Sequence, residues 1–150
     1  SISLCVFNEE VKTKGKLSSI KSSNTLVSIL AAIYAHENRF DNALLLNTEN
    51  LVIECTDSNV FILRNNKLFT PPISDGCVDG TMRRWILEQE NVIEKSILIS
   101  DMIQADTVFL SNAIQGITPV KIINFKDSVE YKTKPAEDLQ EKLINLSSDF

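Results

Sequence analysis

The chain has 150 residues, of which 43% are hydrophobic, enough to bury the core of one ordinary globular domain. Its formal net charge is -5, whereas nucleic acids and anionic membranes require clustered positive charge on a partner surface. We therefore expect neither partner. A small anionic ligand is compatible with this charge, because a few local hydrogen-bond donors can hold it.

The cysteine and histidine content argues against a metal site. The chain has three cysteines and one histidine, and the cysteines lack the short paired spacing of a zinc site. We expect Cys5, Cys55 and Cys77 to be reduced and mostly buried. No signal peptide and no apolar run of about 18 residues is present. These features predict a soluble, cytoplasmic protein without a bound metal.

The first predicted elements are a strand and a helix. The run "SISLCVF" indicates a strand, and because it starts without a methionine or a polar lead-in, we expect further sequence upstream. In "NTLVSILAAIYAHEN", residues 24–38, apolar residues recur at helical spacing. Ser22, Ser23 or Asn24 could cap the start of this helix, and Asn38 could end it. This interpretation places Lys21 just before the helix, at the end of a short extended piece.

Residues 42–72, "NALLLNTENLVIECTDSNVFILRNNKLFTPP", contain apolar runs separated by turn-forming clusters, which predicts an antiparallel meander. The segment "CTDS" breaks the pattern after Glu54. Strict alternation would place Glu54 on the same face as Val52. The pattern alone favours an edge strand with Glu54 facing water over a buried carboxylate, which would need a donor or a positive partner.

The second half of the chain mixes helices and strands. A helix led by Gly80 is predicted in "GTMRRWILEQEN", followed by a short helical turn in "SDMIQA". Strands follow in "TVFLSNA" and "ITPVKIINF", and a last helix runs from about Pro135 to Leu146. The predicted fold class is mixed α/β (α+β), with residues 1–150 as a single domain.

Three positions are candidates for chemistry on residue type alone. A lysine among small residues, such as Lys21, can act as a nucleophile that forms a Schiff base with an aldehyde, although most lysines are solvated surface charges. A glycine at a helix start, such as Gly80, leaves backbone N–H groups that suit a phosphate, or simply caps the helix. Ser111 and Asn112 at a strand end could add donors or form a turn.

The order and spacing of these segments resemble the class IV aminotransferases, the fold-type IV pyridoxal phosphate enzymes. The similarity lies in "IKSSNTL", the meander with its "NVF" and "TP" pieces, "DGTMRR" and "ADTVFLSNAIQGITPV", and it runs from about Ser18 to Val120. The family includes branched-chain and D-amino-acid transaminases and 4-amino-4-deoxychorismate lyase. The resemblance implies the C-terminal domain of the D-amino-acid aminotransferase-like fold, an antiparallel-rich pseudo-barrel sheet with flanking helices.

The resemblance also implies pyridoxal 5'-phosphate as cofactor, with a role for each matched residue. Lys21 would link covalently to the cofactor and move a proton at the substrate's alpha carbon. Glu54 would hold the pyridine nitrogen protonated. Asn59 would have a supporting structural role. The phosphate would be bound by two further segments, the helix start Gly80, Thr81 and Met82, and the pair Asn112 and Ala113.

Departures from the transaminase pattern favour a lyase. The chain has "GTMR" and "NA" where transaminases commonly have "GITR" and a threonine pair, and its "K-x-x-N-x-L" spacing looks more like that of the aminodeoxychorismate lyases. Those enzymes eliminate pyruvate to give 4-aminobenzoate for folate synthesis. Thr25 and Leu26 stand where branched-chain transaminases place a tyrosine, so Thr25 is a candidate substrate contact. A transaminase and a non-catalytic remnant are the alternatives.

Family members also have an N-terminal domain that supplies an arginine to the cofactor phosphate, and nothing in this chain corresponds to it. The resemblance therefore implies that residues 1–150 are the C-terminal, cofactor-binding domain of a longer enzyme. It further implies a homodimer acting on a small amino substrate. We expect this chain alone to bind pyridoxal phosphate weakly or not at all.

Overall fold

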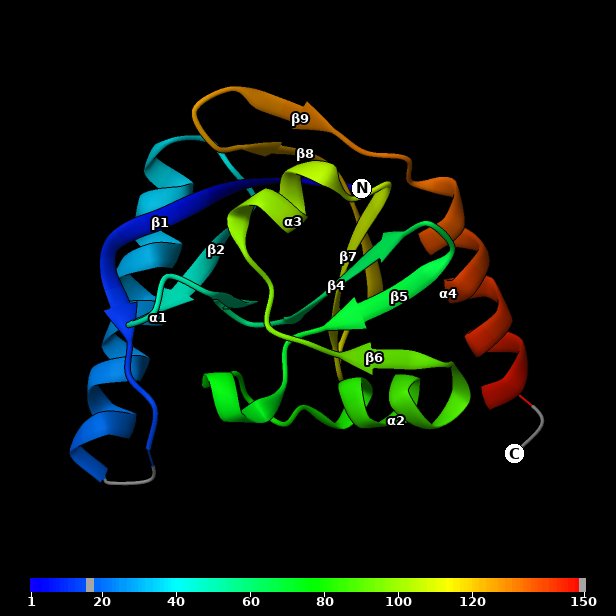
Figure 1. Cartoon of the computed structure of the whole chain (residues 1–150), viewed down its shortest axis with the longest axis horizontal. Coiled ribbons are helices and arrows are strands. Elements are labelled where there is room, and N and C mark those ends of the chain that lie inside the picture. Colours follow the sequence, from blue (N-terminus) through cyan, green and yellow to red (C-terminus); the bar gives the residue numbers. More distant parts are fainter. Residues whose placement is uncertain (16–17, 149–150) are drawn as a thin grey trace.

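The computed structural model describes residues 1–15 and 18–148, with the backbone alone for Ser18 and Ser19. Its elements in chain order are β1 (Ile2–Lys12), α1 (Ser18–Glu37), β2 (Asn42–Asn47), β3 (Val52–Cys55), β4 (Asn59–Arg64), β5 (Lys67–Thr70), the 3-10 helix η1 (Ile73–Asp75), α2 (Thr81–Gln89), β6 (Val92–Glu94), α3 (Ile99–Gln104), β7 (Thr107–Asn112), β8 (Gly116–Asn124), β9 (Ser128–Glu130) and α4 (Lys134–Ser147). Figure 1 shows how they are arranged.

The strands form a closed, barrel-like sheet. The hydrogen-bonded order is β3-β2-β1-β8-β7-β4, and β4 also pairs with β3, which closes the circle. Strands β5 and β6 extend from β4, and β9 pairs with β8. The contacts of β1 with β2 and β8 are parallel, whereas the meander from β2 to β5 is antiparallel. The predicted mixed fold with an antiparallel-rich pseudo-barrel is confirmed.

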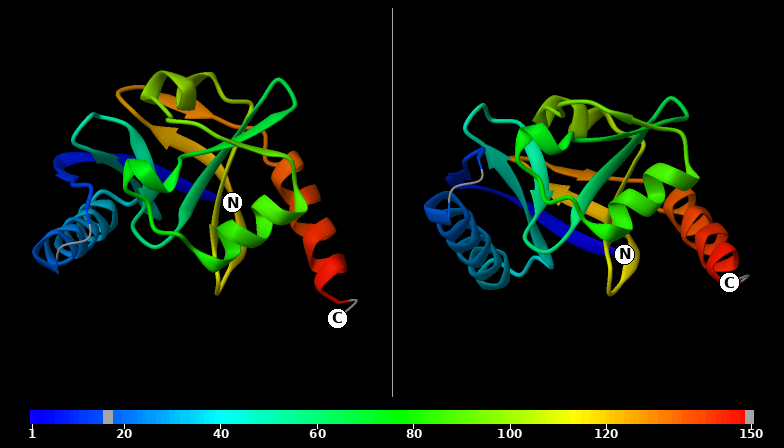
Figure 2. Two further views of the ribbon diagram at one scale, coloured as in Figure 1. Left: turned by 60° about the horizontal axis from the view of Figure 1, so that its bottom comes forward. Right: turned by 90° about the horizontal axis from the view of Figure 1, so that it is seen from below.

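Helices cover the outer faces of this sheet. Helix α1 packs on β1 and β2 by burying Val27 and Ala31 beside Phe7. Helices α2 and α4 cover another face, where Phe61 and Phe109 stack with ring centroids 4.9 Å apart. Figures 1 and 2 show α1 and α4 on opposite sides of the sheet. A further cluster of buried apolar side chains forms the barrel interior, and Met102 of α3 packs into it.

Most predicted elements are present, and one boundary changes the position of a key residue. The structure adds η1, β6 and β9, which are three residues each and too short to give a periodic signal. Helix α1 begins at Ser18, so Lys21 lies inside its first turn, and the prediction of an extended segment there was wrong. Asn24 does not cap the helix. Its side-chain oxygen and nitrogen instead bond the backbone N–H and carbonyl of Thr13 at 2.9 and 2.8 Å.

The cysteines are free and buried, as predicted. Burial raises the pKa of the Cys55 thiol well above its ordinary value and that of Cys5 to about 11. Both thiols are therefore protonated at neutral pH and serve packing. Of the helices within residues 1–15 and 18–148, none has the length and hydrophobicity of a membrane span.

Candidate active site

One pocket of about 750 Å³ gathers every residue predicted for the site. Five segments that are distant in sequence form its walls: the end of β1, the first turns of α1, the end of β3 with the β3–β4 connection, the segment that leads into α2 with the helix start, and the turn between β7 and β8. The predicted residues that line it are Lys21, Thr25, Glu54, Gly80, Thr81, Met82, Asn112 and Ala113. The barrel therefore places these residues next to one another, although they are far apart in the sequence.

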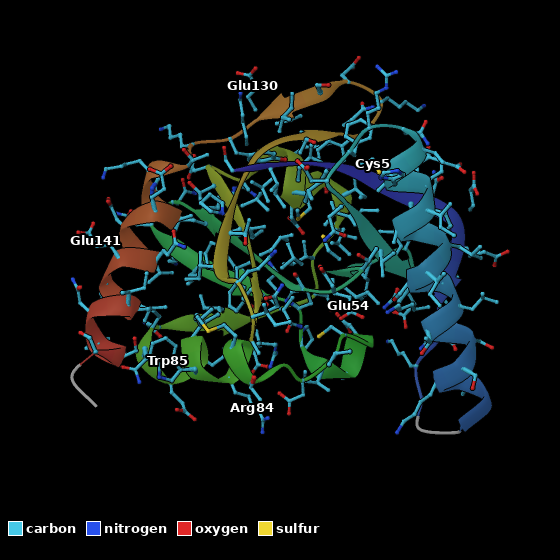
Figure 3. The ribbon with its side chains drawn as sticks, turned by 180° about the vertical axis from the view of Figure 1, so that it is seen from behind. Cys5, Glu54, Arg84, Trp85, Glu130 and Glu141 are labelled. Atoms are coloured by element: carbon cyan, nitrogen blue, oxygen red, sulfur yellow. The ribbon has the colours of Figure 1, made fainter. Side chains whose placement is uncertain are left out.

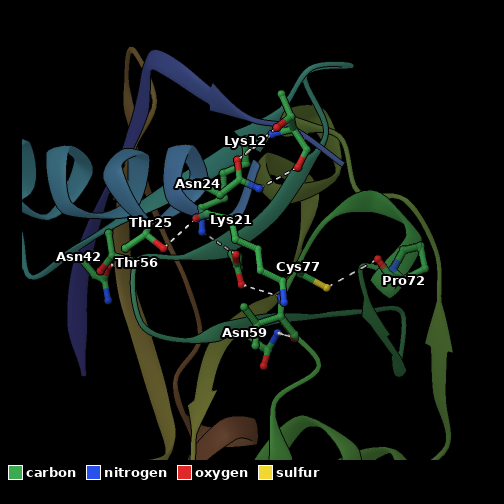
Figure 4. Close-up of polar contacts among 12 residues, drawn as sticks. Lys12, Lys21, Asn24, Thr25, Asn42, Thr56, Asn59, Pro72 and Cys77 are labelled. Carbon is green, nitrogen blue, oxygen red and sulfur yellow. Dashed lines mark hydrogen bonds and ion pairs between the residues drawn. The ribbon is translucent and has the colours of Figure 1, made fainter. Parts of the chain in front are cut away.

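Lys21 reaches the pocket from the first turn of α1. Its side chain is exposed. The Thr25 hydroxyl, one helical turn later, donates to the Lys21 carbonyl oxygen at 2.9 Å. The Thr25 hydroxyl proton is therefore used in this hydrogen bond and is not free for a ligand. The exposed Lys21 side chain also lines the pocket. Figure 4 shows both residues at this helix start.

Glu54 faces the pocket because β3 is irregular. Val52 and Cys55 both pack in the barrel interior, although strict alternation would put residues three apart on opposite faces. The register against β2 skips Ile53: Leu46 faces Val52, and Leu45 faces Glu54. This bulge turns Glu54 to the face opposite Val52, so the expectation of a shared face was wrong. Bulges commonly re-aim a side chain next to an active site.

Glu54 is buried, with 4% of its surface exposed, and both carboxylate oxygens accept a hydrogen bond. Lys12 Nζ donates to Oε1 at 2.9 Å, and the Val78 backbone N–H donates to Oε2 at 3.0 Å. Strand β3 pairs on both sides, so the prediction of an edge strand with Glu54 facing water was wrong. Lys12 was not predicted as a site residue. The only sign of it in the sequence is that a buried carboxylate needs a positive partner.

The start of α2 has the form of an anion-binding site. Gly80 caps the helix without any side-chain hydrogen bond, so the pocket is reached by the first backbone N–H groups. A Cβ on Gly80 would lie 2.5 Å from Asn59 Oδ1, which leaves no room for a side chain. Asn59 in turn donates to the Val78 carbonyl oxygen at 2.8 Å and fixes the segment that enters the helix.

The turn between β7 and β8 forms a further part of the pocket wall. Asn112 Oδ1 accepts from the backbone N–H groups of Ile114 and Gln115 at 3.0 and 2.7 Å, and Nδ2 donates to Ser58 Oγ at 3.0 Å. The Asn112 side chain therefore holds the turn. Beside it, Ser111 is 1% exposed, and its hydroxyl has no hydrogen-bond partner among the described residues. A buried hydroxyl without a partner at a pocket wall is available to a ligand.

Cys77 also lines the pocket but is not a nucleophile there. Burial raises the pKa of its thiol to about 11, although the charge of Arg83 opposes the shift. The thiol is thus protonated at neutral pH. The pocket also holds the side chains of Lys21 and Glu54. Together with an open helix start, they suit an anionic ligand that has an electrophilic carbon and a basic nitrogen.

The comparison with known proteins agrees with this geometry. The family model of amino-transferase class IV matches residues 2–123. The chain is 32% identical over 132 residues to a protein of Methanocaldococcus jannaschii provisionally named a branched-chain-amino-acid aminotransferase, covering 81% of this chain and 46% of that protein. It is 33% identical over 109 residues to an aminodeoxychorismate lyase of Vibrio harveyi, covering 69% of this chain and 40% of that enzyme.

A solved structure supports the same relationship. The branched-chain amino acid aminotransferase of Thermobaculum terrenum in its pyridoxal phosphate form superimposes with a TM-score of 0.77 at 28% identity. The match covers 96% of this chain and 51% of that chain. The chain thus spans about half the length of the relatives that it matches.

Proposed function

The chain belongs to the class IV aminotransferases, a family of pyridoxal-phosphate-dependent enzymes, and on that premise we propose that it is the cofactor-binding domain of a 4-amino-4-deoxychorismate lyase. The observation that carries the proposal is the pocket itself. An exposed lysine, a buried carboxylate and an uncapped helix start, all matched to the family by sequence order, line one cavity. The proposed reaction releases pyruvate from the substrate and leaves 4-aminobenzoate, a step of folate synthesis.

The residues present fit pyridoxal phosphate. No side chain caps the start of α2, and Gly80, Thr81 and Met82 line the pocket, so the first backbone N–H groups of the helix are available to a phosphate. The unpartnered Ser111 hydroxyl and the backbone at Asn112 and Ala113 lie along the same pocket and offer further polar contacts. We therefore assign the phosphate to the α2 start and the β7–β8 turn.

When bound, pyridoxal phosphate supplies an aldehyde carbon and a ring that takes up electrons from the substrate's alpha carbon. In this proposal Lys21 would be held at the aldehyde carbon until the substrate amine replaces it there. Its free Nζ would then accept the proton of the carbon that bears the amine and pass it to the departing three-carbon group, so that the substrate ring becomes aromatic as pyruvate is released. Glu54 keeps a proton on the ring nitrogen. Because its two oxygens have accepted only one bond each, the carboxylate has lone pairs free for that nitrogen.

The lyase is preferred over a transaminase on three short motifs. These are "GTMR" at the start of α2, "NA" at the end of β7 and "K-x-x-N-x-L" in α1. Relatives of both kinds match this chain, so an amino-acid transaminase is the second candidate. A non-catalytic remnant of the fold is the candidate from another class.

Parallel assays on one preparation of the purified protein with added cofactor separate these functions. The first supplies 4-amino-4-deoxychorismate and measures pyruvate and 4-aminobenzoate, and the second supplies amino acids with a 2-oxo acid and measures amino transfer. We expect any pyruvate that is released to be matched by an equal amount of 4-aminobenzoate. Amino transfer without pyruvate release would contradict the lyase assignment and support the transaminase. Activity in neither assay, in a protein that traps cofactor at Lys21, would point to a partner domain as a requirement.

We further propose a second domain and a second copy of the chain in the working enzyme. Helix α1 carries Lys21 in its first turn and continues with a line of exposed apolar side chains, Leu26, Ile29, Leu30 and Ile33, which are 54%, 52%, 40% and 49% exposed. Such a face next to a site is typical of an interface. The free, buried cysteines support a cytoplasmic location.

Sedimentation velocity tests the proposed dimer. We expect the wild-type chain to self-associate with rising concentration and Ile33→Glu to stay monomeric, because a charge within an apolar interface is costly to bury. Ile144→Glu is the matched control, since Ile144 is a 58% exposed isoleucine on α4. If the two variants self-associate to the same extent, α1 is not the dimer surface.

A further inference from the structure

A second lysine, Lys12, lies inside the pocket and is used by none of the steps above. It is the last residue of β1, and its ammonium group donates to Glu54 Oε1 at 2.9 Å. The side chains of Lys12 and Glu54 are only 8% and 5% exposed. Figure 4 shows Lys12 near the Lys21 helix turn, and Figure 3 shows Glu54 in the interior between α1 and the segment that leads into α2.

The path of β1 is what brings Lys12 to this place. Phe7 pairs with Leu45 of β2, and the next pair is Lys12 with Asn47, so β1 uses five residues where β2 uses two. The intervening residues Asn8 to Glu10 are exposed, and the strand returns to β2 only at Lys12. Regular pairing of β1 with β2 stops at Phe7, and the irregular stretch that follows brings the Lys12 side chain to the inside of the protein.

A buried ion pair needs an explanation beyond stability. Removing two charges from water costs about as much as their attraction returns, and apolar residues of similar volume often stabilise as well or better. Lys12 and Glu54 stand in a pocket wall, where two apolar side chains would pack without that cost. What the pair provides, and an apolar pair does not, is a carboxylate that stays ionised and fixed although it is buried.

From these contacts we infer that Lys12 is a positioning residue for the site: it keeps Glu54 an anion and aims it at the ring nitrogen of the cofactor. The inference rests on the proposed function for the identity of that nitrogen. Lys12 and the Val78 N–H each hold one oxygen, so the carboxylate plane is fixed from two sides. The next residue, Thr13, is bonded by Asn24 of α1, so the end of β1 also anchors the helix turn that carries Lys21.

The first test needs no cofactor. Lys12→Met leaves Glu54 buried without its cation, so we expect Glu54 to take up a proton at neutral pH, seen as a carboxylic acid band in the infrared spectrum. The band should be absent from wild type, from Lys12→Arg and from the double variant Lys12→Met/Glu54→Gln. The urea midpoint should fall further in Lys12→Met than in the double variant. An ionised Glu54 in folded Lys12→Met would overturn the inference. If Lys12→Met does not fold, the double variant should still fold, and a double variant that is also unfolded would overturn the inference.

The second test uses pyridoxal phosphate and borohydride trapping, with the yield of the Lys21 adduct at one cofactor concentration as the readout. We expect Lys12→Met to lower the yield about tenfold, the effect of losing a hydrogen bond to a buried ionised group. Lys12→Arg should restore most of it. Lys14→Met is the control, because Lys14 lies two residues away and pairs with the exposed Glu49. Equal yields in Lys12→Met and Lys14→Met would overturn the inference. A wild-type chain without a Lys21 adduct would instead count against the proposed function, and the infrared result would still decide the role of Lys12.

Discussion

At the scale of single residues, Gly80 is a position where the structure leaves no space for a side chain. Its φ of -67° is accessible to any residue, so a substitution causes no backbone strain and is opposed only by the steric clash of the new side chain. Gly80→Ala places a Cβ 2.5 Å from Asn59 Oδ1, and Asn59 must move off the Val78 carbonyl oxygen. We expect a loss of about 1–3 kcal/mol in the free energy of unfolding, measured by urea titration, from overpacking.

The partner of that contact supplies the control. In the background Asn59→Ala the obstructing amide is gone, so Gly80→Ala should cost far less there than in wild type. The two substitutions are therefore expected to be strongly non-additive. An equal cost of Gly80→Ala in both backgrounds would show that the close approach to Asn59 is not what requires glycine.

Cys77 sets a pH dependence of stability. Its thiol has a pKa of about 11 in the folded chain because it is buried, against an ordinary 9.0. The unfolded chain therefore loses the proton first as pH rises. This thiol leaves the free energy of unfolding unchanged below pH 9.0 and lowers it between pH 9.0 and about pH 11, by at most about 1.4 kcal/mol per pH unit. Urea unfolding of wild type and Cys77→Ala across this range measures the effect. Identical pH profiles would contradict it.

At the scale of elements, the link between β1 and α1 depends on Asn24. Its amide replaces a strand partner for Thr13 by accepting from the N–H and donating to the carbonyl oxygen. Asn24→Ala removes both bonds and should cost about 1–2 kcal/mol. We expect faster hydrogen exchange in the first turns of α1, around Lys21. Asn38→Ala, at the other end of the helix, removes the bond to Tyr34 and should leave that exchange unchanged. Slow exchange around Lys21 in Asn24→Ala would contradict the anchoring role.

The elements also show which parts of the structure can be predicted from sequence. Periodicity predicts α2, α4 and the meander, because their apolar residues repeat at fixed spacing over many positions. It fails where the register shifts. The bulge at Ile53 turns Glu54 into the pocket, and the irregularity before Lys12 does the same for that lysine. Both depend on the pairing of a second strand, which no local pattern contains.

At the scale of the whole molecule, the closed sheet explains how the site is assembled. The pairing of β3 with β4 completes the barrel, and the β3–β4 connection comes to lie between the starts of α1 and α2. Sequence order and resemblance predicted which residues meet there, as the lining of one pocket shows. They could not predict the exposure of Lys21, since a side chain's solvent contact depends on what packs around the finished fold.

The most direct measurement is covalent trapping of pyridoxal phosphate on the purified chain, followed by peptide mass mapping. Borohydride is added before dialysis, because we expect this chain alone to hold the cofactor weakly. Lys21→Ala and Lys121→Ala are compared with wild type, since Lys121 is an exposed lysine on β8. We predict one adduct on the Lys21 peptide, lost in Lys21→Ala and kept in Lys121→Ala. Adducts spread over surface lysines, or none at Lys21 in a chain that circular dichroism shows to be folded, would contradict the assignment of this pocket as the cofactor site.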